Sequence, residues 1–517
     1  MTAWSDRRAW LATGAALFVL GAWPLVLVEL PPLQDLPNHV ASAFIARHPA
    51  RYPDLAFNGL WKSNALLELW LSRFDDLRLG ARLFTALAIA AGAFGLPWVV
   101  LELAGRRALR SASLLLWPLV HGFFVAMGML NFAIAFPLAM IVLVGLERQR
   151  AAPSVARGAR IAALALVTWY AHPFPLIVVG GLAAVELATG RAARREAGRA
   201  GLRTALATLA PLVPAGALVL GTALDHLIKA TPAAAVPAAW PTVWDLVAQL
   251  WLHGAGPLTR WGSATVVPVI ALAILAWRQR GARPAMLGGW GVALLAASYA
   301  GLPLMASNWW YLDSRLVPFL WLAAAVRAPA QLPRGWAPVL AACAVASSLA
   351  LGVDYVRLDR DRAELAAGVV AVPDGATLLP LLFEHRRTSD FTASLTHAWA
   401  DYVLERRTSA PLVFAVERSY ALTYRDFPPA ALIPPALDRF AELPATPATD
   451  CPAGSRPTDC EARWRLAWAQ LWAQASRQRA SQSAGRLPAG HPVAGVAWSS
   501  AKRSSAGGIS AAGGKSR

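Results

Sequence analysis

Long uncharged runs alternate with short arginine-bearing stretches through the first two-thirds of the chain. Runs without Asp, Glu, Lys or Arg cover residues 9–28, 83–101, 111–145, 161–185, 204–224, 261–277, 284–312, 316–326 and 335–353. About 20 consecutive apolar residues are enough for a helix to cross the hydrocarbon core of a bilayer. The pattern therefore predicts an all-α polytopic membrane bundle of about 11 spans, some of them short or broken.

Two of these runs have to be divided. The run 111–145 is too long for one crossing, and we expect it to fold back near Gly128-Met129-Leu130-Asn131. The run 161–185 contains His172-Pro173-Phe174-Pro175, and proline breaks a helix interior. We therefore expect two short helices that meet inside the membrane. Non-helical backbone is tolerated at that depth only against protein or a water-filled cavity.

The arginines predict the orientation of the bundle. Seventeen of them fall in the stretches 105–110, 147–160, 190–203, 278–283 and 327–334, and the alternate connections hold almost none. Because cytoplasmic loops of membrane proteins are rich in Lys and Arg, we expect these five stretches to be cytoplasmic. The alternate connections, 29–82, 225–260 and 305–315, then face outward. An odd number of spans also places everything after residue 353 outside.

Three regions follow from this pattern. We expect a transmembrane domain with a large outer loop, a small α/β extracytoplasmic domain and a disordered basic tail. Their ranges are 1–353 with loop 29–82, 354–475, and 476–517. In the outer domain, a turn at Val372-Pro373-Asp374-Gly375 precedes a predicted strand at Leu378–Phe383, and Leu412–Val416 is a second.

The cysteines agree with an outer, oxidising location for this domain. Cys451 and Cys460 bracket a loop with two prolines and a glycine. Disulfides persist in oxidising compartments, so we expect these two residues to form one; two free thiols are the alternative. Cys343 lies in the last uncharged run, where it acts most simply as a small apolar residue.

Composition supports the membrane class and argues against a nucleic-acid partner. Only 15% of the 517 residues are charged and 56% are hydrophobic, whereas soluble domains carry about 25% charged residues. The net charge of +18 comes almost entirely from arginine, since only four of the 48 basic residues are lysine. Together with the abundance of Ala, Pro and Gly, this preference for arginine suggests a GC-rich genome, and the positions of the arginines are more informative than their number.

The strongest candidate for chemistry follows the first uncharged run, in Pro31-Pro32-Leu33-Gln34-Asp35-Leu36-Pro37-Asn38-His39. Asp35 and His39 lie one helical turn apart if a helix begins at Pro37. Charged groups at the membrane edge are costly unless they face a cavity or a partner. The alternative is that Asp35 only caps the helix and His39 lies on the surface. The helix itself has an amphipathic pattern typical of one lying on the bilayer.

Other polar groups lie within or beside the uncharged runs. Arg315, in Trp309-Trp310-Tyr311-Leu312-Asp313-Ser314-Arg315, is placed to bind phosphate oxygens with its guanidinium, or to snorkel at the interface paired with Asp313. His172 lies at the proline break, where it either lines a polar cavity or makes a structural hydrogen bond. Further candidates are Asn131, inside a span, and His397, from the outer domain over the cavity.

The layout resembles that of the GT-C class, integral-membrane glycosyltransferases that use polyprenyl-phosphate sugars. A first span, an outer loop that opens with Asp, a helix in that loop, many spans and a C-terminal outer domain carry this resemblance over about residues 1–420. The stretches 34–41 and 128–132 are also similar to a group of uncharacterised bacterial membrane proteins near that class. The resemblance implies a bacterial inner-membrane enzyme that moves a sugar from a polyprenyl-phosphate donor to an extracytoplasmic acceptor.

The resemblance also assigns roles to residues. Asp35 matches the catalytic carboxylate of the first outer loop, and we expect His39, Asn131, His172 and Arg315 to bind substrate. No cofactor is predicted: the Asp-x-Asp pair that some members use for a metal is absent, because Asp35 is followed by Leu and Pro. The alternatives are a transporter or flippase for a lipid-linked or small substrate, and a non-catalytic scaffold. No inverted repeat, common in transporters, is visible.

Overall fold

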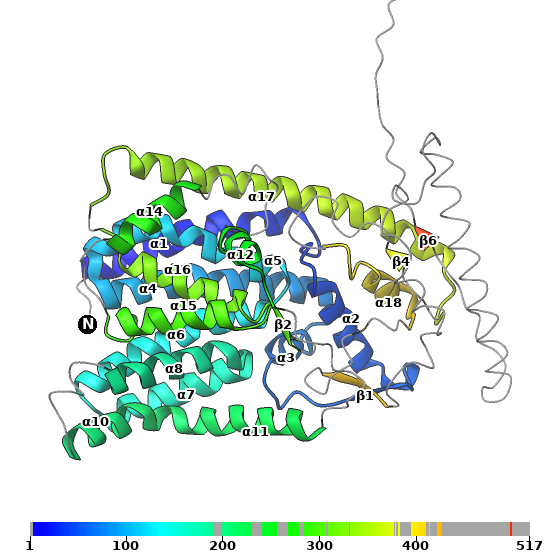
Figure 1. Cartoon of the computed structure of the whole chain (residues 1–517). Helices are drawn as coiled ribbons and strands as arrows, with labels where there is room; N and C mark the ends of the chain where they lie inside the picture. The colour runs from blue at the N-terminus through cyan, green and yellow to red at the C-terminus, as the bar shows by residue number, and fades with distance from the viewer. Residues whose placement is uncertain are drawn as a thin grey trace, which may run out of the picture.

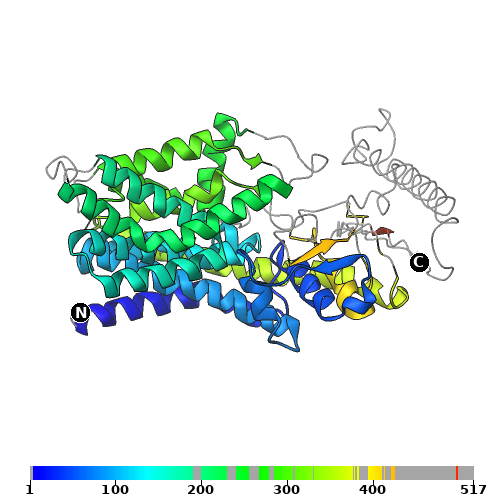
Figure 2. The same ribbon diagram turned by 90° about the horizontal axis from the view of Figure 1, so that it is seen from below.

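The chain folds into an elongated helical bundle with a small polar layer at one end (Figure 1). The computed structural model describes residues 4–189, 199–229, 240–255, 267–278, 284–306, 309–329, 331–376, 378, 381–382, 394–409, 413, 421–425 and 497–498. Figures 1 and 2 both place α2 (Leu36–Arg47), β1 (Leu55–Phe57) and α18 (Ala400–Arg406) at the end of the bundle far from the N-terminus.

The long helices run side by side along the bundle. Besides α2 and α18, the α-helices are α1 (Trp4–Ala22), α3 (Leu66–Leu71), α4 (Leu77–Val120), α5 (Phe123–Ala126), α6 (Leu130–Ala151), α7 (Val155–Ala171), α8 (Pro173–Thr189), α10 (Arg199–Leu209), α11 (Val213–Lys229), α12 (Val243–Ala255), α14 (Val267–Arg278), α15 (Gly289–Gly301), α16 (Val317–Val326) and α17 (Trp336–Ala366). Short 3₁₀ turns are η1 (Trp23–Leu27), η2 (Pro49–Arg51), η3 (Ala210–Leu212), η5 (Ser314–Leu316) and η6 (Ala367–Ala371). The centre of the bundle is α4, which packs against α1, α6 and α16.

The breaks between helices fall where proline, glycine and charge predicted them. Gly105 interrupts α4 with φ 81° and ψ 173°, at the first of the arginine-bearing stretches. The run 111–145 turns at α5 and resumes as α6 from Leu130, and His172 separates α7 from α8. These three expectations are confirmed, because each break occurs where a residue cannot continue the helix or where arginine requires water.

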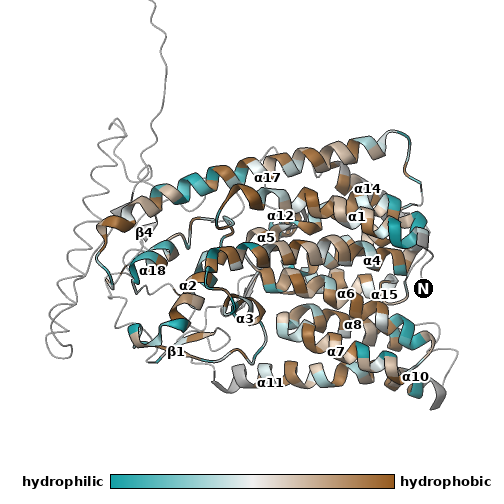
Figure 3. Ribbon diagram, turned by 180° about the vertical axis from the view of Figure 1, so that it is seen from behind, coloured by the Kyte–Doolittle hydropathy of each residue, from teal (hydrophilic) through white to brown (hydrophobic). Residues whose placement is uncertain are grey.

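Five helical stretches are long and apolar enough to cross a membrane, among the residues that the structure describes. They are Ser5–Leu27, Leu77–Ala126, Leu130–Ala151, Gly201–Leu224 and Trp336–Ala371, and Pro173–Thr189 and Ser314–Val326 are shorter apolar helices. Hydrophobic residues dominate the middle of the bundle, and hydrophilic residues gather at its ends (Figure 3). The chain therefore has the character of a multi-pass membrane protein, and the count of about 11 spans stays a prediction.

The polar end is assembled from segments far apart in the sequence. β1 pairs antiparallel with β5 (Leu422–Tyr424), so the first outer loop and the C-terminal region share one layer. The other strands are short pairs: β2 (Met305–Ala306) with β3 (Trp309–Trp310), antiparallel, and β4 (Leu381–Leu382) with β6 (Ala497–Trp498), parallel. A second hydrophobic core joins Ile45 and Tyr52 of the loop to Trp399 and Val403 around α18.

Helix α2 is enclosed by protein, so the prediction that it lies on the bilayer is wrong. It packs against α3, α4 and α18, and Leu36, Val40 and Ile45 are at most 1% exposed. Its apolar face covers the bundle, and α18 covers the face expected to meet lipid or water. An amphipathic pattern indicates which face is buried but does not say what buries it.

The expected outer domain is only partly within the described residues. Its boundary at residue 354 falls inside α17, which continues without a break to Ala366. The pair Cys451 and Cys460 lies outside the described residues, as does most of the expected strand at 412–416. Of the tail from residue 476, only Ala497–Trp498 is described.

Candidate active site

The loop that carries Asp35 is fixed through its backbone. The peptide N–H of Gln34 donates to the carbonyl of Ala126 and that of Asp35 to the carbonyl of Met127, both at 3.0 Å. Gly128 follows with φ 79°, and a Cβ there would lie 2.7 Å from the Leu36 nitrogen. The two short motifs of the sequence, 34–41 and 128–132, thus lie directly against each other.

The carboxylate of Asp35 does not cap the helix that it precedes. Asp35 occupies the N-cap position of α2, but its side chain makes no capping hydrogen bond. Instead, its Oδ1 lies 3.6 Å from Nε2 of His397 and accepts a long hydrogen bond of 3.5 Å from Gln34 Nε2. The alternative interpretation, that Asp35 only caps the helix, is therefore wrong. Burial raises the pKa of Asp35 from 3.8 to about 6, against the opposing effects of His39 and Gln34.

His397 approaches Asp35 with a defined tautomer. Asn38 Nδ2 contacts His397 Nδ1 at 3.2 Å. Because an amide nitrogen donates, Nδ1 accepts, and a neutral ring then carries its proton on Nε2, the atom that faces Asp35. Burial and the charge of His39 lower the pKa of His397 to about 3, which keeps the ring neutral near pH 7. The sequence placed His397 over the cavity, and the structure places it beside Asp35.

His39 is paired with Glu68 rather than exposed. Its Nδ1 lies 2.7 Å from Glu68 Oε1, and side-chain exposure is 11% for His39 and 7% for Glu68. Burial lowers the pKa of His39, but the Glu68 carboxylate outweighs it, with a smaller contribution from Asp35, so the net shift is upward. His39 thus brings positive charge close to Asp35, and the alternative of a surface histidine is wrong.

Asn131 positions the helix that carries Glu68. Its Oδ1 accepts from the peptide N–H of Leu67 at 3.0 Å, and its Nδ2 donates to the Asn64 carbonyl at 2.9 Å. These bonds satisfy backbone groups at the start of α3, which otherwise lack partners inside the helix. The structure therefore gives Asn131 a positioning contact one residue before Glu68.

Arg315 and His172 form a second cluster inside the bundle. Arg315 is 6% exposed, and its NH1 donates to Nε2 of His172 at 2.9 Å. Its guanidinium carbon lies 5.7 Å from the ring of Phe132 and 5.8 Å from that of Phe174. The interpretation of Arg315 as a snorkelling interface residue is wrong, since it is buried, and the Asp313 carboxylate accepts from Ser314 instead.

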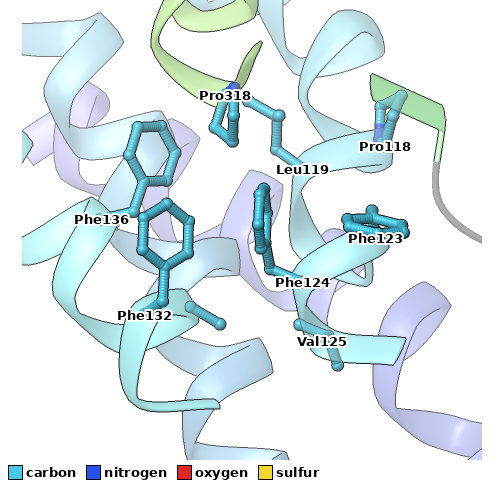
Figure 4. Close-up of a pocket in the computed structure, with 10 residues that line it drawn as sticks. Pro118, Leu119, Phe123, Phe124, Val125, Phe132, Phe136 and Pro318 are labelled. Carbon is cyan, nitrogen blue, oxygen red and sulfur yellow. The ribbon is translucent and has the colours of Figure 1, made fainter. Parts of the chain in front are cut away.

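An aromatic cluster borders this arginine. Phe123, Phe124, Phe132 and Phe136 converge with Pro118 and Pro318 around a cavity of about 30 Å³ (Figure 4). Phe132 also meets the His172 ring edge-on at a centroid distance of 5.5 Å. A cavity of this size holds about one water molecule and no lipid chain. Asn131, the neighbour of Phe132, links this cluster to the layer that holds Glu68.

Sequence reasoning missed one residue of the site, Asn38, and gave Glu68 no specific role. Glu68 is the single acid in Leu66-Leu67-Glu68-Leu69-Trp70-Leu71, and its charge in the first outer loop already makes it a candidate for a site or a partner. Asn38 carried no such signal, because its role depends on a histidine 359 positions later. Within the described part of the chain, no three His, Cys, Asp or Glu side chains converge to hold a metal ion.

The similarity of this chain to known proteins lies in solved structures. No protein-family model matches the chain, and no curated protein matches it. Among solved structures, the chain is similar to ArnT from Cupriavidus metallidurans in the apo state, with 14% sequence identity and a TM-score of 0.48. The overlap covers 77% of this chain and 84% of that one. A similarity at this level carries no argument about function, which has to come from the residues of this chain.

Proposed function

We propose that the protein is a membrane glycosyltransferase that moves a sugar from a polyprenyl-phosphate donor to an acceptor at the outer face of the membrane, with Asp35 as general base. One observation carries the proposal. A carboxylate that is only 16% exposed, with a pKa of about 6, lies beside the end of a membrane span, where backbone bonds fix it and it caps no helix.

The chemistry requires a base, and Asp35 has the properties of one. A general base works best when its pKa lies slightly below the operating pH. Asp35 accepts the proton of the acceptor hydroxyl while that oxygen attacks the anomeric carbon of the donor. The bond from this carbon to the phosphate oxygen breaks, and the polyprenyl phosphate leaves with the electron pair. A single displacement of this kind inverts the configuration at the anomeric carbon.

The surroundings of Asp35 suit this role. His397 directs an N–H toward Oδ1, which orients the carboxylate, and Asn38 fixes the tautomer of His397. The charge of His39, which Glu68 stabilises, keeps the pKa of Asp35 below the value that burial alone would give. Asp35 is therefore ionised near pH 7 and still basic enough to accept a proton.

Arg315 is proposed to bind the leaving phosphate. A guanidinium can only donate hydrogen bonds, so His172 accepts through Nε2 and leaves the positive charge of Arg315 intact. The rings of Phe132 and Phe174 hold the guanidinium plane in place. A fixed cation of this kind offsets the charge that develops on the phosphate oxygens.

The test is Asp35→Asn in the full chain, purified in lipid nanodiscs. Transfer of radiolabelled sugar from a panel of undecaprenyl-phosphate hexoses is expected to fall about 10²- to 10⁴-fold, because the amide cannot accept the proton. Thermal stability at pH 7.5 is expected to stay the same or rise, because a buried charge is removed. Asp75→Asn, an exposed acid in the same loop, is the matched control and is expected to leave both unchanged.

Two outcomes oppose the proposal. Full activity of Asp35→Asn would remove the catalytic assignment. Movement of the labelled lipid across the bilayer, with no sugar transfer by the wild type, would favour the transporter or flippase instead.

A further inference from the structure

A second cavity, apart from the aromatic cluster, opens beside the chain that leads to Asp35. It has a volume of about 480 Å³, within the range of roughly 300–1,000 Å³ typical of small-molecule sites. It lies between η1 with the residues after it, the start of α4, the outer part of α17, and α18. Its lining combines three arginines and three acids with apolar residues of the first span.

Two of the three arginines are held in ion pairs. Arg78 lies 2.7 Å from Glu405 and 3.3 Å from Asp401. Arg362 lies 3.1 Å from Asp359 and 3.6 Å from Asp401. These pairs neutralise most of the charge on the α17–α18 side of the cavity.

The third arginine and one acid of the lining are in no ion pair among the described residues. Arg82 is half-buried, and among the described residues its one hydrogen bond is from NH1 to the Val28 carbonyl at 3.3 Å. Glu29 is exposed and makes no hydrogen bond or ion pair within the described part of the chain. The cavity is thus neutral as a whole, but it presents one available cation and one available anion.

The rim of the cavity is apolar and lies at the end of the first span. Val26 is 79% exposed and Leu27 is 43% exposed, and both line the cavity. An exposed apolar edge at the end of a span is in contact with lipid chains in a membrane. A ligand with a polar head in the cavity and a hydrocarbon chain along this rim therefore matches every part of the lining.

We propose that this cavity binds the zwitterionic phosphoethanolamine head group of a bilayer lipid. The phosphate accepts hydrogen bonds from Arg82, whose remaining guanidinium donors face no other acceptor within the described residues. The primary ammonium group donates to Glu29 and to the neighbouring Asp359. The acyl chains follow Val26 and Leu27. This site is separate from Arg315 and does not depend on the proposed transferase chemistry.

The arrangement of charges in the cavity favours phosphoethanolamine over other lipid head groups. A purely anionic lipid would bring its phosphate to Arg82 but would leave Glu29 without a cation, whereas Asp359 keeps its ion pair with Arg362. A choline head group carries the right charges, but its quaternary nitrogen has no N–H to donate. Hydrogen bonds between charged partners are the strong ones, so the primary amine is the distinguishing feature.

The experiment measures lipid retention by the purified full chain in native mass spectrometry. The probes are phosphatidylethanolamine, phosphatidylcholine, phosphatidylglycerol and inorganic phosphate. Wild type is expected to retain phosphatidylethanolamine about tenfold more strongly than phosphatidylcholine or phosphatidylglycerol. Arg82→Gln and Glu29→Gln are each expected to weaken that retention about tenfold, and Arg82→Lys is expected to weaken it less.

Two control variants change charges that lie outside the cavity. Arg73→Gln and Asp75→Asn change exposed charges in the first outer loop, beside α4, and are expected to leave retention unchanged. Equal retention by wild type and Arg82→Gln would overturn the site. Equal retention of phosphatidylglycerol and phosphatidylethanolamine would overturn the role of Glu29. Inorganic phosphate that competes at the same concentration as the lipid would overturn the role of the apolar rim.

Discussion

At the scale of single residues, backbone hydrogen bonds fix the position of Asp35, and nearby side chains influence the pKa of its carboxyl group. Its peptide is bonded to Met127, while its carboxylate meets His397 at 3.6 Å. Because the main chain is fixed by backbone bonds and not by the side chain, the carboxylate makes no capping bond, and only its Oδ1 meets Gln34 and His397. The charge state of Asp35 is then decided by burial, which raises its pKa, and by His39, which lowers it.

The two effects predict the pH dependence of activity. Asp35 must be ionised to act as a base, so the rate is expected to fall about tenfold per pH unit below a limb near pH 6. The contribution of Asp35 to the free energy of unfolding changes with pH in the opposite direction to the rate. The pKa is about 6 in the folded chain and 3.8 in an exposed aspartate, so the folded state binds more protons between these values, and stability falls as pH rises through this window.

Glu68→Gln is predicted to shift the acidic limb of the pH–rate profile to higher pH. Without the carboxylate, the pKa of His39 falls, and near pH 7 the ring loses the positive charge that lowers the pKa of Asp35. The limb of the rate profile should then lie above pH 6 by about half a unit to one unit. The measurement is the pH profile of kcat/KM for wild type, Glu68→Gln and Asp75→Asn. A limb that stays in place in Glu68→Gln would mean that His39 does not influence Asp35.

At the scale of elements, the close approach of 34–36 to 126–128 depends on a glycine. Gly128→Ala would place a Cβ 2.7 Å from the Leu36 nitrogen and 2.8 Å from that of Asp35. Gly59 has the same φ of 79° but has nothing within 4 Å of its Cβ position, so Gly59→Ala carries only the cost of the left-handed backbone, about 1–2 kcal/mol.

We predict that the two alanine variants differ in activity more than in folding. Gly128→Ala should lose about 1–3 kcal/mol more stability than Gly59→Ala, because the loop has to move. Its transfer rate should fall by about 10², since a shift of about 1 Å at a catalytic group has that effect. Chemical unfolding and turnover of both variants provide the measurement. Equal activities would show that the contact between the two motifs does not position Asp35.

The same elements show how far sequence reasoning reaches. Proline at 173 breaks a helix for a local reason, and the arginines of the stretch 105–110 predicted an interruption where Gly105 leaves the helical conformation. The burial of α2 was not, because it depends on α18, which is distant in sequence and has no long apolar run. The pairing of Asn38 with His397 is long-range in the same way, whereas the charge of Glu68 in the first outer loop is recognisable from the sequence and only its pairing with His39 is not.

At the scale of the whole molecule, the two ends of the bundle differ in composition. The N-terminal end of α1 lies at one end, and α2, β1 and α18 lie at the other (Figure 1). Arginine-bearing breaks, such as the one after α6 with Arg148 and Arg150, are expected at the cytoplasmic end. This arrangement would place the Asp35 cluster on the outer side, where the proposed function requires it.

Reporter fusions test this orientation. A fusion after residue 153 should give a cytoplasmic signal and one after residue 407 an extracytoplasmic signal, because the five arginine-bearing stretches follow the positive-inside rule. Alkaline phosphatase and green fluorescent protein fusions at both positions form reciprocal controls. A cytoplasmic signal after residue 407 would put Asp35 and His397 on the side opposite to the one proposed.

The unbroken course of α17 has a consequence for the acceptor. At about 1.5 Å per residue, the part from residue 354 to Ala366 extends about 20 Å beyond the uncharged run, and Arg362 on it donates to the carbonyl of Leu30, five residues before Asp35. Trp23 and Ser348 tie the same helix to the first span. The length of this helix therefore sets the distance between the uncharged run and the segment that carries Asp35. In the proposed transferase, this distance would select acceptors by how far their hydroxyl stands from the membrane.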